Sequence, residues 1–193
     1  MNLRLQNARH GGIMYYKKLE NNIIDVIKEE QIKLGYRSET VRLYYPLSSL
    51  NNFLCTDYDI TEMVFELKSF CNYVKEKLGE ITISNKGERF CFAIPPMATD
   101  YVHEHMEDNE FIADFINTIA KHGVTIDEIL NQFYKYSEKV HFEKMEDEEF
   151  NYLVYFEDGV PDEYRYCITD EGHHMIYHRF TVWDYNDLYG TLP

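Results

Sequence analysis

The sequence predicts an α+β protein in which a winged-helix-like N-terminal module is followed by a module of helices and an antiparallel β-meander. Residues 59–94 combine a helical apolar stripe with a hairpin pattern, and residues 125–156 repeat this combination more weakly. The last third of the chain consists of short alternating runs separated by turn residues. Helices followed by a run of strands are typical of α+β proteins.

The segment 59–78 is the strongest helix prediction. Asp59 and Glu62 have the spacing of a capping box, and Gly79 supplies the residue that tolerates a left-handed helix end. Its apolar residues follow a period of 3.6: Met63, Leu67, Phe70, Cys71, Val74 and Leu78. We therefore expect one face of this helix to be buried.

The neighbouring segments complete the order of a winged helix. We expect a helix at 16–34, a short strand at 41–45 and a short helix at 47–54. Two alternating runs after the capped helix, 80–84 and 88–94, are joined by Asn-Lys-Gly and predict a hairpin. In the winged-helix interpretation this hairpin is the wing.

Residues 1–13 do not follow the pattern of the rest and are assigned no function. Gly11-Gly12 before Met14 resembles a translated ribosome-binding site, so we expect Met14 to be the natural start. N-terminal sequencing of the native protein would contradict this expectation if it found residues before Met14.

The pair Pro95-Pro96 predicts the boundary between two modules, 14–97 and 98–193, because paired prolines resist both helix and central strand. A single continuous α+β domain is the alternative. In the second module we expect a helix at 101–122 and a capped helix opening at Thr125.

Four strands are expected after that helix, at 140–145, 150–156, 163–169 and 175–183. Turn residues separate them, which predicts a four-stranded antiparallel meander. Its first hairpin would be the wing of a second, degenerate winged helix.

Charge divides the chain unequally. The net charge is −15, with 13 basic and 13 acidic residues in 1–100 but 6 basic and 21 acidic residues in 101–193. An acidic second half repels nucleic acid and anionic lipid, so nucleic acid is disfavoured and the expected protein partner would be basic or cationic where it meets this half. High solubility is the alternative explanation of the acidity.

The chain is expected to be cytoplasmic. No apolar run approaches the ~18 residues of a membrane span, and the N-terminus lacks the apolar core of a signal peptide. The four cysteines form no CxxC pair, and three lie inside predicted helices or strands, as small buried hydrophobes do.

No enzyme motif is present: phosphate-binding, dinucleotide-binding, nucleophile-elbow and zinc-protease patterns are all missing from the sequence, and no cofactor is expected. Histidine is the remaining catalytic candidate, with seven of the eight histidines after residue 100. Neutral imidazole binds divalent metals. The candidate metal ligands are His103, His105, His173, His174 and His178, and ordinary surface histidines are the alternative.

Nucleic-acid binding follows from the winged-helix interpretation, in which the longer helix enters the major groove. The start of that helix carries Asp57, Asp59, Glu62 and Glu66, which repel phosphate. Lys75, Lys77, Lys86 and Arg89 remain as backbone contacts.

Tyrosines in the predicted meander are candidates for a protein-binding surface. An apolar ring whose hydroxyl group reaches solvent suits such interfaces. The candidates are Tyr152, Tyr164, Tyr166 and Tyr177. The alternative is that these rings only cover the helices.

Several runs together resemble a known family: KKLENNIIDVIKEEQIKLGYRSETVRLYYPLSSLN, GERFCFAIPP, YVHEHMEDNEFI, HGVTIDEIL and YLVYFEDGVPDEYRYCITDEGHHMIYHRF. The family belongs to Firmicutes, mainly intestinal clostridia, and its domain has no known function. The likeness covers about residues 14–180. It implies a bacterial, cytosolic protein and no activity or catalytic residue.

The first expectation for function is a non-catalytic cytoplasmic protein-interaction or regulatory module. A nucleic-acid-associated winged-helix protein and a metal-dependent enzyme using the C-terminal histidines are the two alternatives.

Overall fold

The structure is a computed structural model that describes the backbone of residues 3–107, 109–146 and 149–190, and side chains from residue 15 onward. The fold is α+β, as predicted, with helices and two antiparallel sheets. The chain forms two compact units, Met1–Glu107 and Asp108–Pro193. No helix in the described part of the chain is both long and apolar enough to cross a membrane.

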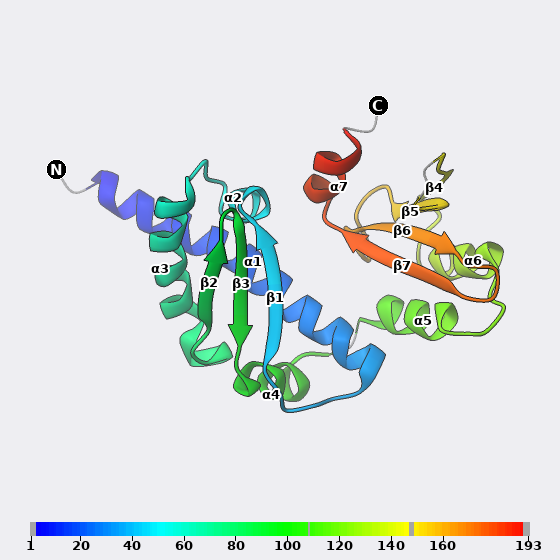
Figure 1. The fold of residues 1–193 in the computed structure, drawn as a ribbon, viewed down its shortest axis with the longest axis horizontal. Helices are drawn as coiled ribbons and strands as arrows, with labels where there is room; N and C mark the ends of the chain where they lie inside the picture. Colours follow the sequence, from blue (N-terminus) through cyan, green and yellow to red (C-terminus); the bar gives the residue numbers. More distant parts are fainter. Residues whose placement is uncertain (1–2, 108, 147–148, 191–193) are drawn as a thin grey trace. The chain divides into compact units, whose positions relative to one another are not determined.

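The first unit follows the predicted order of elements. It contains α1 (Leu3–Leu34), β1 (Val41–Pro46), α2 (Leu47–Leu54), α3 (Ile60–Leu78), β2 (Thr82–Lys86), β3 (Arg89–Ile94) and α4 (Pro96–His105). Its antiparallel sheet has the order β1-β3-β2, so the β2–β3 hairpin leaves β2 at one edge (Figure 1). The interpretation of this order as a winged helix stays a prediction.

The capped helix is confirmed as α3. Glu62 N–H donates to Asp59 Oδ1 at 2.9 Å, and Asp59 N–H donates to Glu62 Oε2 at 3.1 Å. Gly79 ends the helix with φ of +75°, and a Cβ there would lie 2.8 Å from Cγ of Pro95. Both the backbone conformation and the close approach of Pro95 therefore require glycine.

The apolar stripe of α3 faces the core, with one exception. The buried members are Met63, Leu67, Phe70, Val74 and Leu78, whereas Cys71 is partly exposed. On β3, Phe90, Phe92 and Ile94 alternate toward the same core, and each has 0 % of its surface exposed. The core of the first unit thus lies between one face of its sheet and its helices.

The predicted helix at 101–122 is wrong, because two helices replace it: α4 and α5 (Glu110–Ile119). Pro96 does not end structure but begins α4, where proline is tolerated because a first-turn N–H has no helical partner. Asn109 caps α5 by accepting a hydrogen bond from Ile112 N–H at 3.3 Å.

The boundary between the two units follows α4 and not Pro95-Pro96. Helix α4 packs on α1 and α3 of the first unit, which moves the division of the chain to Glu107. That the two units fold as separate domains stays a prediction. The expected tail at 1–13 is helical from Leu3, because α1 begins there.

The second unit confirms the meander. It contains α5, α6 (Ile126–Tyr136), β4 (Val140–Lys144), β5 (Tyr152–Phe156), β6 (Arg165–Asp170), β7 (Met175–Phe180) and α7 (Val182–Tyr189). The sheet order is β4-β5-β6-β7, and the strands are antiparallel. The predicted last strand runs three residues too far, because Thr181 caps α7 by accepting from Asp184 N–H at 3.2 Å.

Aromatic rings fill the second unit on both faces of its sheet. On the side of α5 and α6, Phe111 lies 4.9 Å from Phe133 and 4.8 Å from Phe156 between ring centroids. On the other side, a cluster next to α7 buries Phe150, Leu153, Cys167 and Tyr185. Helices and side chains therefore cover both faces.

Candidate functional site

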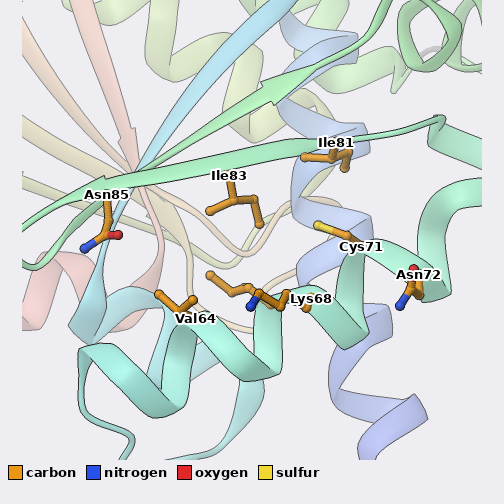
Figure 2. A pocket seen from close by; sticks show the side chains of 8 residues that line it. Val64, Lys68, Cys71, Asn72, Ile81, Ile83 and Asn85 are labelled. Atoms are coloured by element: carbon orange, nitrogen blue, oxygen red, sulfur yellow. The ribbon is translucent and has the colours of Figure 1, made fainter.

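A groove of about 390 Å³ lies between α3 and β2 of the first unit (Figure 2). Its lining comes from one side of the helix and from alternate positions of the strand segment: Val64, Leu67, Lys68, Cys71, Asn72, Ile81, Ile83 and Asn85. We call this feature the α3–β2 groove. Its volume falls in the range of ~300–1,000 Å³ that is typical of ligand pockets.

The walls of the α3–β2 groove are mostly apolar, with Lys68 among them, and its ends are polar. Ile83 points toward the helix and Val64 toward the strand, while Asn85 and Asn72 lie at opposite ends (Figure 2). The spacing of three and four residues between Val64, Leu67, Lys68 and Cys71 places them in neighbouring turns of one helix face.

Cys71 is a wall residue of the α3–β2 groove. Burial raises the pKa of its thiol to about 11, so the thiol stays protonated at neutral pH. A protonated, half-buried thiol behaves as a small apolar group.

The backbone edge of β2 lies beside this groove. The two-residue turn Gly87-Glu88 makes Lys86 and Arg89 the closing pair of the hairpin, which exchanges hydrogen bonds. Because hydrogen-bonded and non-hydrogen-bonded pairs alternate, the N–H and C=O groups of Ile83 and Asn85 point away from β3. Within residues 3–107, neither residue makes a backbone hydrogen bond outside the sheet.

The solvent face of the first sheet carries positive charge. The register places on this face Arg42, Tyr44, Thr82, Ser84, Lys86, Arg89, Cys91 and Ala93, and we call it the basic sheet face. Three of these side chains are cations and none is a carboxylate. Arg89 lies over the ring of Tyr44, 4.7 Å from its centroid, beside a surface hollow of about 520 Å³.

Phe65 adds an exposed apolar ring on α3, one residue from the groove-lining Val64. Its exposed fraction is 66 %, and Lys68 Nζ lies 5.1 Å from the ring centroid. Asn85 belongs to both the α3–β2 groove and the hollow on the basic sheet face. The edge of β2 thus separates an apolar surface from a basic one.

The acids near the start of α3 have structural partners. Asp59 and Glu62 form the capping box, and Glu66 accepts a hydrogen bond from the Tyr16 hydroxyl. Burial, followed by this bond to Glu66, raises the pKa of Tyr16 well above its usual range.

The opposite side of α3 is anchored to α1 through a buried carboxylate. Glu20 accepts hydrogen bonds from Lys77 at 2.8 Å, Lys17 at 3.1 Å and Tyr73 at 3.2 Å. Burial alone would raise the pKa of Glu20, but the bonds from Lys77 and Lys17 outweigh it and lower the pKa below its usual value.

The histidines predicted as metal ligands fall into separate places. His103 stacks on Tyr36 with centroids 4.1 Å apart, and His105 stacks on Tyr101 at 4.7 Å. Both lie on α4 of the first unit. His178 lies on β7, where its ring contacts Phe150 at 5.4 Å.

His173 and His174 meet a residue that the sequence analysis did not select. His122, after α5, lies 5.5 Å from His173 and 5.1 Å from His174 between ring centroids, and Gly123 N–H donates to the carbonyl of His173 at 2.9 Å. Among the described residues, no group of three or more His, Cys, Asp or Glu side chains is arranged to hold a metal ion. A metal site here stays a prediction.

The predicted tyrosine surface needs a correction. Tyr166 has 0 % exposure and lies 4.9 Å from Phe115 between centroids, so it belongs to the core. Tyr177 packs on the same ring at 4.7 Å. Side chains alternate along a strand, and the face chosen for these two tyrosines is the one that α5 covers.

The other two candidate tyrosines are partly exposed. Tyr152 stacks on Phe142 at 5.9 Å, and Tyr164 lies under the Arg179 guanidinium, 4.1 Å from the ring centroid. Whether they bind a partner stays a prediction.

Sequence reasoning missed the α3–β2 groove because its residues have the composition of a core. One signal was present: Val64 lies beside the helical stripe that contains Met63 and Leu67, so an apolar residue extended that stripe toward the hairpin.

Comparison with protein families matches residues 16–189 to a family described as a domain of unknown function from an E. rectale gene description (DUF3877). This match covers most of the chain and confirms the resemblance to a family without known function. No curated protein and no solved structure matches the chain.

Proposed function

Because the chain belongs to the DUF3877 family, whose function is unknown, we propose its function from its own surfaces: a cytoplasmic, non-catalytic module that binds a protein partner along the α3–β2 groove. One observation carries the proposal. A groove with mostly apolar walls adjoins a strand edge whose N–H and C=O groups point outward. Peptide-binding domains that add a strand to a sheet combine these same two features.

The exposed residues around the groove favour a macromolecular partner. Phe65 is a large apolar side chain that is 66 % exposed, and aromatic residues are enriched in protein interfaces. The groove runs beside β2, so an extended chain that lies along this strand would contact its lining.

The test is a pull-down from a lysate of the organism that encodes the protein, with every sample treated with nuclease. The baits are the wild-type chain, Ile83→Ser in the groove and Ile176→Ser as the matched control. Ile176 is an isoleucine on β7, an edge strand of the other sheet, and is 43 % exposed. Circular dichroism and thermal unfolding establish that both variants fold.

The proposal predicts a discrete protein that wild type and Ile176→Ser retain equally and Ile83→Ser loses. Equal recovery with all three baits, or no recovery with any bait, contradicts it.

A second candidate is binding of nucleic acid through the basic sheet face. Arg42, Lys86 and Arg89 beside the exposed Tyr44 combine cations with a stacking ring, as single-strand-binding surfaces do. The acids at the start of α3 oppose insertion of that helix into a major groove. A salt-sensitive shift with single-stranded DNA that is lost in Lys86→Gln/Arg89→Gln supports this candidate, and no shift at low salt contradicts it.

A further inference from the structure

From the two surfaces that meet at β2 we infer that the partner segment is an extended peptide in which apolar and acidic residues alternate, and that it adds to β2 as a fourth strand. This inference rests on the proposed function, since it assumes that the α3–β2 groove binds a protein. It goes further by naming the chemistry of the segment.

The pleat of the sheet determines which side chains of an added strand face α3. A strand that pairs with the edge of β2 continues the pleat of the sheet, so its side chains alternate between the two faces. Residues opposite Ile83 and Asn85 face α3, and residues opposite Ser84 and Lys86 face solvent. The segment from Ile81 to Asn85 rises roughly 13 Å, at about 3.3 Å per residue.

On the side toward α3, the added strand would face the α3–β2 groove. The walls there are mostly apolar, with Lys68 as one cation among Val64, Leu67, Cys71, Ile81 and Ile83, and the thiol of Cys71 is uncharged at neutral pH. Two side chains of the added strand that lie two residues apart, at a spacing of about 6.6 Å, would enter this groove. Apolar side chains gain from burial against these walls, whereas basic side chains lose hydration and are repelled by Lys68.

On the solvent side, the added strand would lie next to the basic sheet face. Lys86 is exposed at the end of β2, Arg89 is exposed opposite it, and the basic sheet face carries no carboxylate. Among the described residues of the first unit, ion pairs are formed by Lys17, Lys33, Lys75 and Lys77, and not by Lys86 or Arg89. Acidic side chains on the added strand would therefore meet unneutralised positive charge.

The acidity of the chain does not come from the three strands of the first sheet, which contain no Asp or Glu. The net charge of −15 is carried by the second half, while residues 1–100 have balanced charge. At 0.15 M ionic strength the Debye length is about 8 Å, so the charges within about that distance of the added strand act on it most strongly.

Labelled synthetic octapeptides test the inference by fluorescence anisotropy with the full chain at 0.15 M salt. One peptide alternates Val and Glu, a second alternates Val and Lys, and a third has the composition of the first in two blocks. We expect the Val-Glu peptide to bind at least about tenfold more tightly than either of the others. Equal affinity of the Val-Glu and Val-Lys peptides overturns the inference.

Protein variants assign the charge preference to the basic sheet face. Lys86→Gln/Arg89→Gln is expected to weaken the Val-Glu peptide about tenfold, as loss of two rim charges does. The matched control is Lys144→Gln, an exposed lysine at the end of the edge strand β4, which should leave affinity unchanged. Equal losses in both variants would place the peptide elsewhere.

Backbone methylation of the peptide tests strand addition without altering the protein. In antiparallel pairing the valine N–H groups bond to Ile83 and Asn85, so N-methyl-valines abolish binding and N-methyl-glutamates do not. Parallel pairing reverses the two results. Binding that survives both modifications, or tighter binding of single-stranded DNA to the same cations, overturns the inference.

Different results contradict the peptide chemistry and the proposed function. Capture of a protein that depends on Ile83, together with equal affinity for the two alternating peptides, keeps the proposed function and removes the charge pattern. Capture that is independent of Ile83 removes both.

Discussion

The two sheets of this chain use the same antiparallel pairing but differ in what covers them. The three-stranded sheet buries Phe90 and Phe92 on one face and leaves Tyr44, Lys86 and Arg89 exposed on the other. The four-stranded sheet has aromatic clusters against both faces. Aromatic content therefore does not identify a binding surface, because the covering helices decide whether a ring stabilises the fold or meets a partner.

A matched pair of tyrosines tests this comparison with the largest expected effect. Tyr166→Ala removes a ring with 0 % exposure and should lower the free energy of unfolding by about 3–5 kcal/mol. Tyr44→Ala removes a ring that is 53 % exposed and should change it by about 0.5 kcal/mol or less. Urea unfolding of both variants gives the measurement, and similar losses would contradict the contrast.

The two sides of α3 give the next largest contrast. Leu67 has 1 % exposure at the floor of the α3–β2 groove, so Leu67→Ala should cost about 2–5 kcal/mol through lost burial and a cavity. Phe92→Ala on the facing strand should cost a similar amount, about 3–5 kcal/mol. Phe65→Ala on the same helix should cost less than about 0.5 kcal/mol, because the ring is 66 % exposed. Changes below that value at both Leu67 and Phe92 would disprove the assigned core face.

Glu20 tests the anchored side of α3 through pH. Its lowered pKa means that the ionised form favours folding, so its contribution is fully present above the usual value of 4.5 and is lost as pH falls through the lower folded value. Glu20→Gln should cost about 1–3 kcal/mol at pH 7 and progressively less toward pH 3. The control is Glu76→Gln on the exposed side of α3. A pH-independent loss in Glu20→Gln would contradict the assigned ionisation.

The smallest effect is a rate and not a change in stability. The pKa of Cys71, about 11, predicts slow alkylation at pH 8 compared with the exposed Cys55. A bound peptide should slow Cys71 further and leave Cys91, on the opposite sheet face, unchanged. Mass spectrometry of timed samples measures all three rates, and equal protection of Cys71 and Cys91 would argue against a groove-specific ligand.

The predictable parts of the fold were those with local physical causes. The capping residues Asp59 and Thr125 and the turn glycines fix their elements through neighbours in the sequence, and the apolar stripe of α3 fixed its buried face. The role of Pro96 is not predictable from the sequence, because proline can either end a helix or begin one. That Pro96 begins α4, and does not mark the boundary between modules, depends on the tertiary packing of this helix.

The candidate site was less predictable because it depends on contacts between distant segments. Tyr166 and Tyr44 look alike in the sequence, and only the placement of α5 distinguishes them. His122 lies more than fifty residues from His173, so no spacing could connect them. The α3–β2 groove likewise forms where two apolar segments approach without closing.

Amide hydrogen exchange, measured by NMR with and without saturating Val-Glu peptide, tests the central claim most directly. Strand addition predicts that the amides of Ile83 and Asn85 become protected on binding, while that of Ser84, already bonded to β3, changes little. Peptide binding that leaves Ile83 and Asn85 unprotected, or that protects the edge strands of the second sheet instead, would contradict the assignment of β2 as the partner-binding edge.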